Sequence, residues 1–322
     1  MDSFLQSLLN VFRNIKRPII KAKNLNYSYK DEKVLKNFSF SLQKSQIVAV
    51  VGRSGEGKST FLHLVVGVLS SGFSNNLQIM GKHSAFAKKD IGFVPQEIAV
   101  IPDISIEHNI IFFGNLYGMT KAKSLKKGKE LMETLHLNVP LSKKPTELSG
   151  GQKVRLNIVV SFLHNPKLMI LDEPFVGLDF YNRKLLWHFL EYQKNRRKAI
   201  VVTTHMLHEA EQHANQIVLL HKGKVFARGK LKDIREKLDT LYIAEYKFES
   251  LSKQKIESIK KYCYSHEITI MNHFNNYMMF SINREGQRLY LSKFFEKINA
   301  INTEISFREP NLDELFLKVM HV

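Results

Sequence analysis

Residues 52–60 read Gly-Arg-Ser-Gly-Glu-Gly-Lys-Ser-Thr and directly follow the apolar run Ile-Val-Ala-Val-Val at residues 47–51. They fit the pattern G-x-x-x-x-G-K-[ST], and the strand-like run before them and the helical pattern after them are the setting of a phosphate-binding loop. Glycines let backbone N–H groups turn toward phosphate oxygens, aided by the positive end of the following helix. The residues expected to contact a nucleoside triphosphate are Gly52, Ser54, Gly55, Gly57, Lys58, Ser59 and Thr60.

Within this loop, Lys58 is expected to reach the β- and γ-phosphates and Ser59 to bind Mg²⁺. A second polar feature lies at residues 168–173, which read Leu-Met-Ile-Leu-Asp-Glu. This apolar strand places Asp172 and Glu173 at the carboxyl edge of a sheet, where open α/β folds bind ligands. Asp172 is suited to hold Mg²⁺ and Glu173 to act as general base toward water, although an acidic pair after a strand can also cap a helix.

Residues 148–152, Leu-Ser-Gly-Gly-Gln, open a predicted helix that runs to about residue 163. The side chains of Ser149 and Gln152 and the amides of Gly150 and Gly151 make a second anion-binding helix start. One ATP has no need of two such cradles in one chain. We therefore expect a second subunit to present this helix start to the nucleotide.

Composition limits the remaining choices. The chain has 322 residues, which suggests about two domains. Its 48 Lys and Arg against 30 Asp and Glu give a net charge of +18, compatible with polyphosphate, anionic lipid or nucleic acid. The single cysteine, Cys263, excludes an intrachain disulfide and favours a reducing compartment. Apolar runs are far shorter than the roughly 20 residues that span a bilayer, so we expect no transmembrane segment.

Apolar periodicity predicts the order of the elements. A β-rich stretch covers residues 19–42, and buried strands follow at residues 47–51, 91–94, 168–171, 199–203 and 217–220. Residues 105–163 are helical in pattern. Strands alternating with helices indicate an α/β fold with a mostly parallel sheet, from which the long helical stretch protrudes as a lobe.

Both ends of the chain have a different texture. Residues 1–18 form an amphipathic segment with a basic end, which can pack on protein or lie in a membrane interface. After residue 230, strands are expected at residues 242–248, 267–271, 277–282 and 303–307, with helices at residues 253–262, 287–298 and 311–319. The order βαββαβ predicts a small α+β, ferredoxin-like C-terminal domain that ends in a helix.

These motifs, in this order, make residues 20–230 resemble the nucleotide-binding domain of ATP-binding cassette (ABC) transporters. The resemblance implies a P-loop NTPase core with an antiparallel β subdomain and a helical subdomain. It assigns Gln96 to the Q-loop, which links Mg²⁺ and the attacking water to the helical subdomain. It also assigns Asp179 to the D-loop, His205 to the switch histidine at the γ-phosphate, and Tyr29 to the aromatic that stacks on adenine. We divide the chain into residues 1–18, an ATPase domain at 19–230 with its helical subdomain at about 97–165, and an accessory domain at 231–322.

The resemblance further implies an ATPase with ATP and Mg²⁺ as ligands, the metal held by Ser59, Gln96 and Asp172. Two copies, or one copy and a paralogue, would close around two ATP molecules. A separate transmembrane permease subunit would make the chain a peripheral protein at the cytoplasmic face of the membrane, with no nucleic acid expected as partner. Residues 107–109 and 112–118 and the tail at 309–317 resemble exporter cassettes for drugs, antibiotics, lipids or polysaccharides. The alternative is a soluble cassette ATPase that acts on ribosomes or nucleic acid.

Glu56 departs from the family pattern, because it places an acid in the phosphate loop where a small residue is usual. A carboxylate that pointed inward would repel the bound phosphates. We predict that the Glu56 side chain points outward, away from the nucleotide. On that basis, Glu56→Ser is not expected to tighten ATP binding by more than about tenfold, or ~1.4 kcal/mol.

Overall fold

The computed structural model describes residues 17–70, 76–83, 86–248, 251–274, 277–297 and 304–320. The predicted N-terminal amphipathic segment lies, up to residue 16, outside the described residues. The chain divides into two compact units. The first comprises Met1–Met206 and His213–Val225, and the second comprises Leu207–Gln212 and Phe226–Val322. In the described residues, no helix is both long and apolar enough to cross a membrane.

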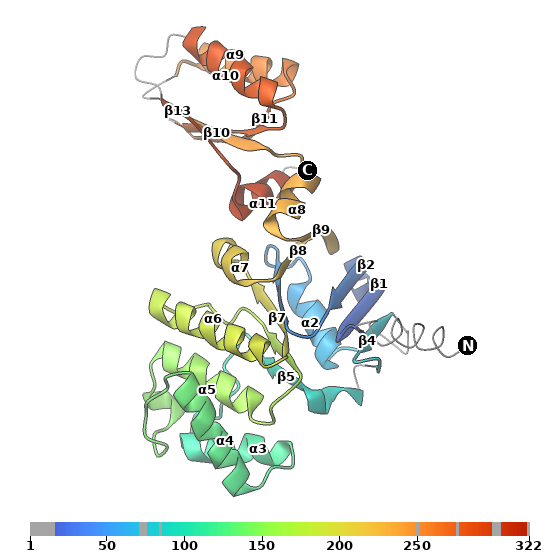
Figure 1. Ribbon diagram of the computed structural model, residues 1–322, viewed down its shortest axis with the longest axis vertical. Helices are drawn as coiled ribbons and strands as arrows, with labels where there is room; N and C mark the ends of the chain where they lie inside the picture. Colours follow the sequence, from blue (N-terminus) through green and yellow to red (C-terminus); the bar gives the residue numbers. More distant parts are fainter. Residues whose placement is uncertain are drawn as a thin grey trace, which may run out of the picture. The chain divides into compact units, whose positions relative to one another are not determined.

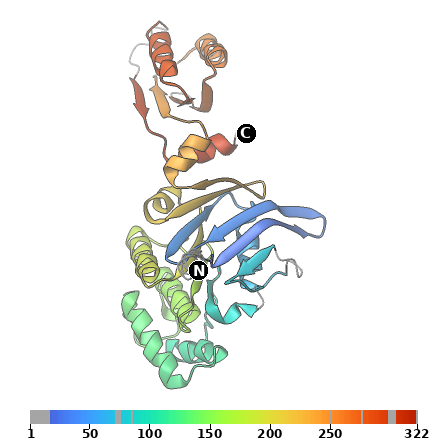
Figure 2. The ribbon, with the colours of Figure 1, turned by 45° about the vertical axis from the view of Figure 1, so that its right-hand side comes forward.

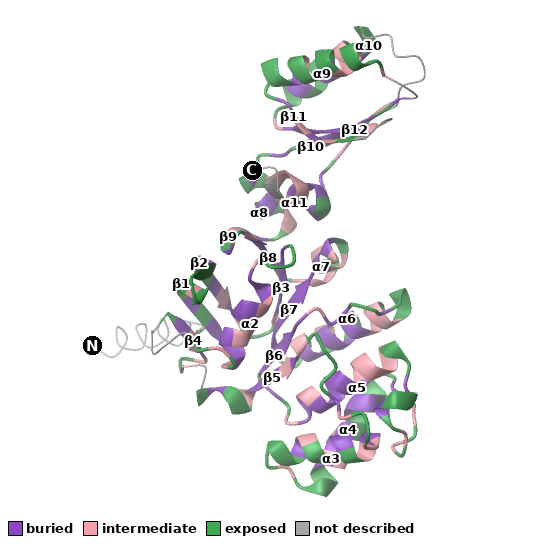
Figure 3. Ribbon diagram, turned by 180° about the vertical axis from the view of Figure 1, so that it is seen from behind, coloured by how far each residue is buried: buried purple, intermediate pink, exposed green. Residues whose placement is uncertain are grey.

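A six-stranded sheet forms the centre of the first unit (Figure 1). In spatial order its strands are β5 (Ile91–Val94), β6 (Leu168–Leu171), β7 (Ala199–Thr204), β3 (Gln46–Val51), β8 (Gln216–His221) and β9 (Lys224–Gly229). The pairs from β5 to β8 are all parallel. Every residue of β6 and β7 is buried, which explains why these strands read as unbroken apolar runs (Figure 3). Parallel pairing also places the carboxyl ends of β3, β5, β6 and β7 at one edge.

A smaller antiparallel sheet covers the nucleotide-loop helix α2 (Lys58–Val66). Its strands lie in the order β2 (Glu32–Leu42), β1 (Ile20–Tyr29) and β4 (Leu77–Ile79). Phe38 and Phe40 of β2 pack on Phe61 of α2, with ring centroids 4.5 and 4.8 Å apart. These rings belong to one buried cluster with residues of the six-stranded sheet, so both sheets and α2 share a core. This is the antiparallel β subdomain that the resemblance implies.

Three helices form the lobe between β5 and β6: α3 (Ile106–Leu116), α4 (Lys121–Thr134) and α5 (Gly150–Phe162), green in Figure 2. Ser105, Thr120 and Ser149 cap their N-termini, each accepting a hydrogen bond from the backbone N–H three residues later. The α6 helix (Phe180–Asn195) and the short α7 helix (Leu207–His213) follow along the chain. No helix was predicted over residues 180–195.

Besides Leu207–Gln212 of α7 and the end of β9, the second unit contains α8 (Leu231–Lys237), β10 (Tyr242–Lys247), α9 (Lys253–Ser265), β11 (Thr269–Phe274), β12 (Tyr277–Ile282), α10 (Glu285–Lys297), β13 (Glu304–Arg308) and α11 (Leu312–Met320). Its sheet has the order β11-β12-β10-β13, and all neighbours are antiparallel. This is the ferredoxin-like βαββαβ arrangement predicted from the sequence. The strand expected from residue 267 begins at Thr269, because Glu267 still turns with φ of 55°.

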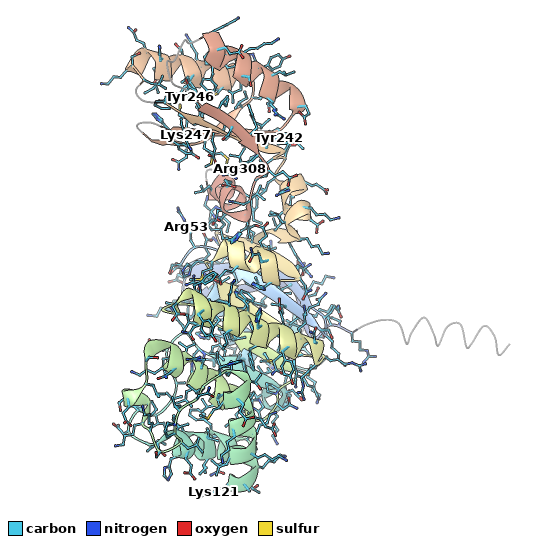
Figure 4. The ribbon with its side chains drawn as sticks, turned by 60° about the vertical axis from the view of Figure 1, so that its left-hand side comes forward. Arg53, Lys121, Tyr242, Tyr246, Lys247 and Arg308 are labelled. Carbon is cyan, nitrogen blue, oxygen red and sulfur yellow. The ribbon has the colours of Figure 1, made fainter. Side chains whose placement is uncertain are left out.

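Arg308 organises the end of the second unit. Its guanidinium donates to Oε1 of Glu245 at 2.6 Å and to Oε1 of Glu314 at 2.7 Å. Glu314 is buried, and its carboxylate also accepts from the Asn311 backbone N–H at 2.7 Å, which closes the first turn of α11. Figure 4 shows Arg308 on the opposite side of the sheet from Tyr246, which packs toward α9 and α10. The tail at 309–317 thus anchors α11 to the sheet.

Candidate functional site

The phosphate loop connects β3 to α2 through residues 52–57. Gly57 caps α2 with φ of 98° and Gly55 has φ of 83°, backbone conformations that side chains with a Cβ rarely adopt. A Cβ at Gly57 would lie 2.9 Å from Cδ2 of Leu35, so β2 also leaves no room for one. The loop therefore ends at a helix start, where the first backbone N–H groups have no partner within the helix, and this is an anion-binding geometry.

Lys58 is buried, with 8% of its surface exposed, and its ammonium group closes the loop. Nζ donates to the carbonyl oxygens of Gly52 at 2.7 Å and Arg53 at 3.1 Å. The same atom lies 3.4 Å from Oε1 of Glu173, whose side chain is 11% exposed. Charge-assisted contacts of this kind fix a cation where a phosphate chain would lie along the loop.

The two acids at the end of β6 differ in their surroundings. Asp172 is 3% exposed, and its Oδ1 accepts a hydrogen bond of 2.6 Å from the hydroxyl of Thr203 on β7. The backbone N–H of Glu173 donates to that same hydroxyl at 2.8 Å. Glu173 has φ of 46°, a left-handed backbone conformation, so the chain turns directly after Asp172. Thr203 therefore links both acids.

His205 follows β7 directly, and the turn there is shaped by Thr204, whose hydroxyl accepts from the Met206 backbone N–H at 2.9 Å. Nδ1 of His205 lies 3.0 Å from Oε2 of Glu173, while 61% of the His205 side chain is exposed. The structure thus gathers Lys58, Glu173 and His205 from three elements. Each oxygen of the Glu173 carboxylate faces one basic group.

Gln96 follows β5 and is exposed at the same sheet edge as Asp172, because β5 and β6 are parallel neighbours. The segment after it is bound to the helical lobe. Oδ1 of Asn157 on α5 accepts from the Ala99 backbone N–H at 3.1 Å, and Oδ1 of the buried Asn109 on α3 accepts from that of Ile101 at 2.8 Å. Gln96 therefore stands at the junction of the sheet and the lobe.

The helix start at residues 149–152 lies at the beginning of α5, in the lobe. Ser149 and Gln152 form a reciprocal capping box, with the Ser149 backbone N–H donating to Oε1 of Gln152 at 3.0 Å. Ser149 and Gly150 are exposed, and a Cβ at Gly150 would meet open space. The Ser149 side chain accepts from the Gln152 backbone N–H within this capping box, and the Ser149 carbonyl oxygen accepts from the Lys153 backbone N–H at 2.9 Å in the first turn of α5.

Two further predicted residues lie at element ends. Tyr29 ends β1, is 43% exposed, and meets Tyr27 edge-on at 5.1 Å between ring centroids. Asp179 caps α6, where it accepts from the Asn182 backbone N–H at 2.8 Å and the Asn182 side-chain amide at 2.7 Å. These hydrogen bonds hold the pKa of the Asp179 carboxyl below its usual value. A flat ring and an ionised loop acid are therefore both presented at the surface.

The residues expected to hold Mg²⁺ have suitable donor atoms. Ser59, Gln96 and Asp172 offer hydroxyl, amide and carboxylate oxygens, the hard ligands that Mg²⁺ prefers. Across the described residues, no group of three or more His, Cys, Asp or Glu is placed to hold a metal ion.

Sequence analysis assigned no role to Thr203 or to Asn157. Both are polar residues in largely apolar, buried stretches: Thr203 is the next-to-last residue of strand β7 and has no exposed surface, and Asn157 lies in the middle of α5 with 1% exposed. Because a buried polar side chain needs a hydrogen-bond partner, a polar residue within an apolar stretch of sequence is the signal that could have identified both residues.

Comparison with known proteins assigns the family. Residues 35–176 match the protein family described as "ABC transporter". The chain is 28% identical to the linearmycin resistance ATP-binding protein LnrL of Bacillus subtilis (strain 168) over 306 residues, 94% of this chain and 98% of that protein. It is 31% identical to the Nod factor export ATP-binding protein I of Cupriavidus metallidurans (strain ATCC 43123 / DSM 2839 / NBRC 102507 / CH34), covering 66% of this chain and 71% of that protein.

Among solved structures, the dimeric structure of MJ0796, a bacterial ABC transporter cassette, superimposes with a TM-score of 0.60. That match has 27% identity and covers 66% of this chain and 98% of the other. The phosphate loop and the paired acids, Asp172 and Glu173, lie within the residues that match the family. The chain belongs to the family of ABC transporter ATP-binding proteins, and its first unit is an ABC ATPase domain.

Proposed function

We propose that this chain powers export through a separate transmembrane subunit, with two cassettes closing around two Mg-ATP. The observation that carries the hydrolytic part is the cluster of Lys58, Glu173 and His205 beside the phosphate loop. Support for export comes from the Nod factor export relative and from the resistance protein, which matches this chain over nearly its full length, the second unit included.

Glu173 is the general base in this proposal, because its carboxylate lies at the mouth of the loop and Lys58 and His205 orient its two oxygens. Lys58 and the loop amides bind the triphosphate, and His205 stabilises the γ-phosphate. When bound, Mg²⁺ at Ser59, Gln96 and Asp172 would neutralise phosphate charge. Tyr29 offers a ring for stacking on adenine.

Pairing of two cassettes follows from the position of the α5 helix start. Ser149 and Gly150 are exposed at this anion-binding helix start, and the chain's own phosphate loop already supplies one such start, so a second copy is the natural recipient. Beside Asp179, Phe180 and Tyr181 expose 63% and 66% of their surfaces. Exposed aromatic residues next to a functional loop favour a protein interface there.

The transmembrane partner is proposed to dock on the helical lobe. Asn157 and Asn109 accept hydrogen bonds from the segment after Gln96 and so tie it to α5 and α3, and a shift of Gln96 on nucleotide binding moves the lobe. Ile98 and, on α3, Phe112 and Leu116 expose apolar surface of 40%, 44% and 66%. The chain would thus be a peripheral protein at the cytoplasmic face, and no nucleic acid partner is expected.

Affinity purification from native membranes in mild detergent tests this proposal. Glu173→Gln, which keeps the nucleotide contacts but not the base, is expected to retain a polytopic membrane protein in an ATP-dependent manner. A Lys58→Ala variant is the matched control, since it removes the charge that binds the phosphates. Recovery of ribosomes or nucleic acid alone would overturn the transporter assignment and favour a soluble ATPase.

A further inference from the structure

Glu56 sits inside the phosphate loop, two residues before Lys58, yet only 11% of its side chain is exposed. A carboxylate in a loop that binds an anion repels that anion unless the carboxylate is compensated and turned away. The structure describes both conditions. Oε1 of Glu56 lies 3.2 Å from Nδ1 of His221, whose side chain is also 11% exposed. Oε2 accepts a hydrogen bond from the Lys222 backbone N–H.

These contacts confirm that the Glu56 carboxylate is directed to the turn between β8 and β9. The backbone of this turn is left-handed at two successive residues. Lys222 and Gly223, which follow His221, the last residue of β8, have φ of 48° and 77°. Glu56 therefore ties the phosphate loop to a tight turn that is distant in sequence.

The same turn contacts strand β2 on its other side. The Lys36 backbone N–H donates to the Gly223 carbonyl oxygen at 2.9 Å, and a Cβ at Gly223 would lie 2.1 Å from the Val34 carbonyl oxygen. Gly57 of the phosphate loop also abuts β2, at Leu35. The phosphate loop, the β8–β9 turn and β2 thus each contact the other two.

Strand β2 continues this connection to the expected adenine platform. In the antiparallel register with β1, Leu35 pairs with Tyr27, and Glu32 pairs with Tyr29. A path of contacts therefore runs from the phosphate loop through the Glu56 carboxylate to the β8–β9 turn, from that turn into β2 by a backbone hydrogen bond, and across the strand pair to Tyr29. The phosphate loop at one end of that path would bind the triphosphate, and Tyr29 at the other end would bind the adenine of the same nucleotide.

We propose that Glu56 is a positioning residue, which fixes the phosphate loop relative to the strand pair that carries Tyr29 by anchoring the loop to the β8–β9 turn. The inference rests on the proposed nucleotide contacts of the loop and Tyr29. The proposal predicts a difference between two ligands. Loss of the anchor weakens the binding of a ligand that contacts both the loop and Tyr29, such as ATP, and leaves the binding of a ligand that contacts the loop alone, such as inorganic tripolyphosphate, nearly unchanged.

The test compares dissociation constants for ATP and tripolyphosphate by calorimetry in the full-length protein. Glu56→Ala is expected to weaken ATP binding by about tenfold, the size of one lost charge-assisted contact, and tripolyphosphate binding by less than about twofold. Glu56→Gln keeps an oxygen for the Lys222 amide and is expected to restore most of the ATP affinity. In steady-state hydrolysis, the KM for ATP is expected to rise in Glu56→Ala while kcat changes little.

Glu191→Ala is the matched control, because Glu191 forms the same kind of pair, at 2.9 Å with Nδ1 of His213, in the same unit but outside the loop. It is expected to leave both dissociation constants unchanged. In a Tyr29→Ala background, the effect of Glu56→Ala on ATP is expected to shrink, because the coupled partner is gone.

Two results would overturn the inference: Glu56→Ala binds ATP as tightly as the wild type or more tightly, or it weakens ATP and tripolyphosphate equally. If thermal unfolding shows that Glu56→Ala is not folded, the same dissociation constants are measured for Glu56→Asp, which keeps the charge but has a shorter side chain. A wild type that binds no ATP would instead refute the proposed nucleotide site itself, so the two failures are distinguishable.

Discussion

Glu173 and His205 meet through Oε2 and Nδ1 at 3.0 Å, with the carboxylate largely buried and the imidazole mostly exposed. The other carboxylate oxygen faces the ammonium group of Lys58 at 3.4 Å. The orientation of the carboxylate is therefore fixed from both sides by residues of α2 and of the turn after β7. A base held in this way is ready to receive a proton from water at the end of the phosphate loop.

Replacing this base is the most direct prediction. Glu173→Gln is expected to reduce kcat for ATP hydrolysis by about 10² to 10⁴, the usual contribution of a general base, while ATP binding is retained. Single-turnover hydrolysis and equilibrium ATP binding provide the measurements. Glu191→Gln, at a carboxylate outside the site, serves as the control. Hydrolysis within about threefold of wild type in Glu173→Gln would remove Glu173 from the role of base.

Thr203 yields a second prediction, because its hydroxyl donates to Asp172 and accepts from the Glu173 backbone N–H. Thr203→Val preserves the volume but removes the acceptor of the part-buried Glu173 backbone N–H and the donor to Asp172, so the turn that positions Glu173 is less well fixed. We expect kcat to fall by about tenfold, equivalent to ~1.4 kcal/mol, with the KM for ATP little changed.

Thr203→Ser, which keeps the hydroxyl, is the conservative control and should recover most of kcat. Steady-state hydrolysis over a Mg²⁺ titration measures both variants. A Thr203→Val variant that retains the kcat of the wild type would show instead that the hydrogen bonds of the Thr203 hydroxyl do not position Glu173.

Much of the fold was predictable because buried parallel strands carry continuous apolar runs. The strands at Ile91–Val94 and Leu168–Leu171 have the predicted limits. β4 escaped prediction, since three residues are too few to establish a period. α6 also went unpredicted, although its signal was present: Asp179 caps it, and Leu186 and Leu190 recur on one face.

At the candidate site, the motifs identified the residue types but not their contacts. Sequence placed Glu173 and Lys58 in separate motifs 115 positions apart, and only the parallel order of β3, β7 and β6 brings them together. The hydrogen bonds of Thr203 depend on a neighbouring strand, which no local pattern encodes. The same holds for Glu56, whose compensating groups come from the turn after β8. The assignments of Gln96, Ser149 and Tyr29 to the nucleotide remain predictions.

His164 gives a prediction on pH. Burial lowers the pKa of His164 below its usual 6.5, and the positive charge of Lys198 lowers this pKa further. Two groups act in the opposite direction: the Ile91 carbonyl oxygen, which accepts from Nε2 at 3.0 Å, and the carboxylate of Asp90. The imidazole also stacks on Tyr117, with centroids 3.6 Å apart. Because the folded state favours neutral His164, the unfolded chain takes up the proton first. Stability from this group is therefore present above about pH 6.5 and lost as pH falls through the folded pKa.

Thermal unfolding from pH 7.5 to 5.5 measures this loss. His164→Gln can still donate to the Ile91 carbonyl oxygen but does not titrate, so its Tm is expected to fall less steeply with acid than that of the wild type. The difference between the two slopes isolates His164 from the chain's other histidines. Equal slopes would contradict the prediction.

Cys263 provides a probe of the second unit. It is 1% exposed in α9, among residues such as Tyr246 and Phe280, and burial raises the pKa of the Cys263 thiol to about 12. Because the thiolate is the reactive form, alkylation of native protein at pH 8 is expected to be at least about a hundredfold slower than in urea. Pulsed labelling with N-ethylmaleimide and mass spectrometry measures the rates, with Cys263→Ser as the blank.

As the chain has one cysteine, labelling across a urea gradient reports unfolding of this unit alone. Rapid labelling of the native protein would show instead that the core between α9, α10 and the sheet opens readily.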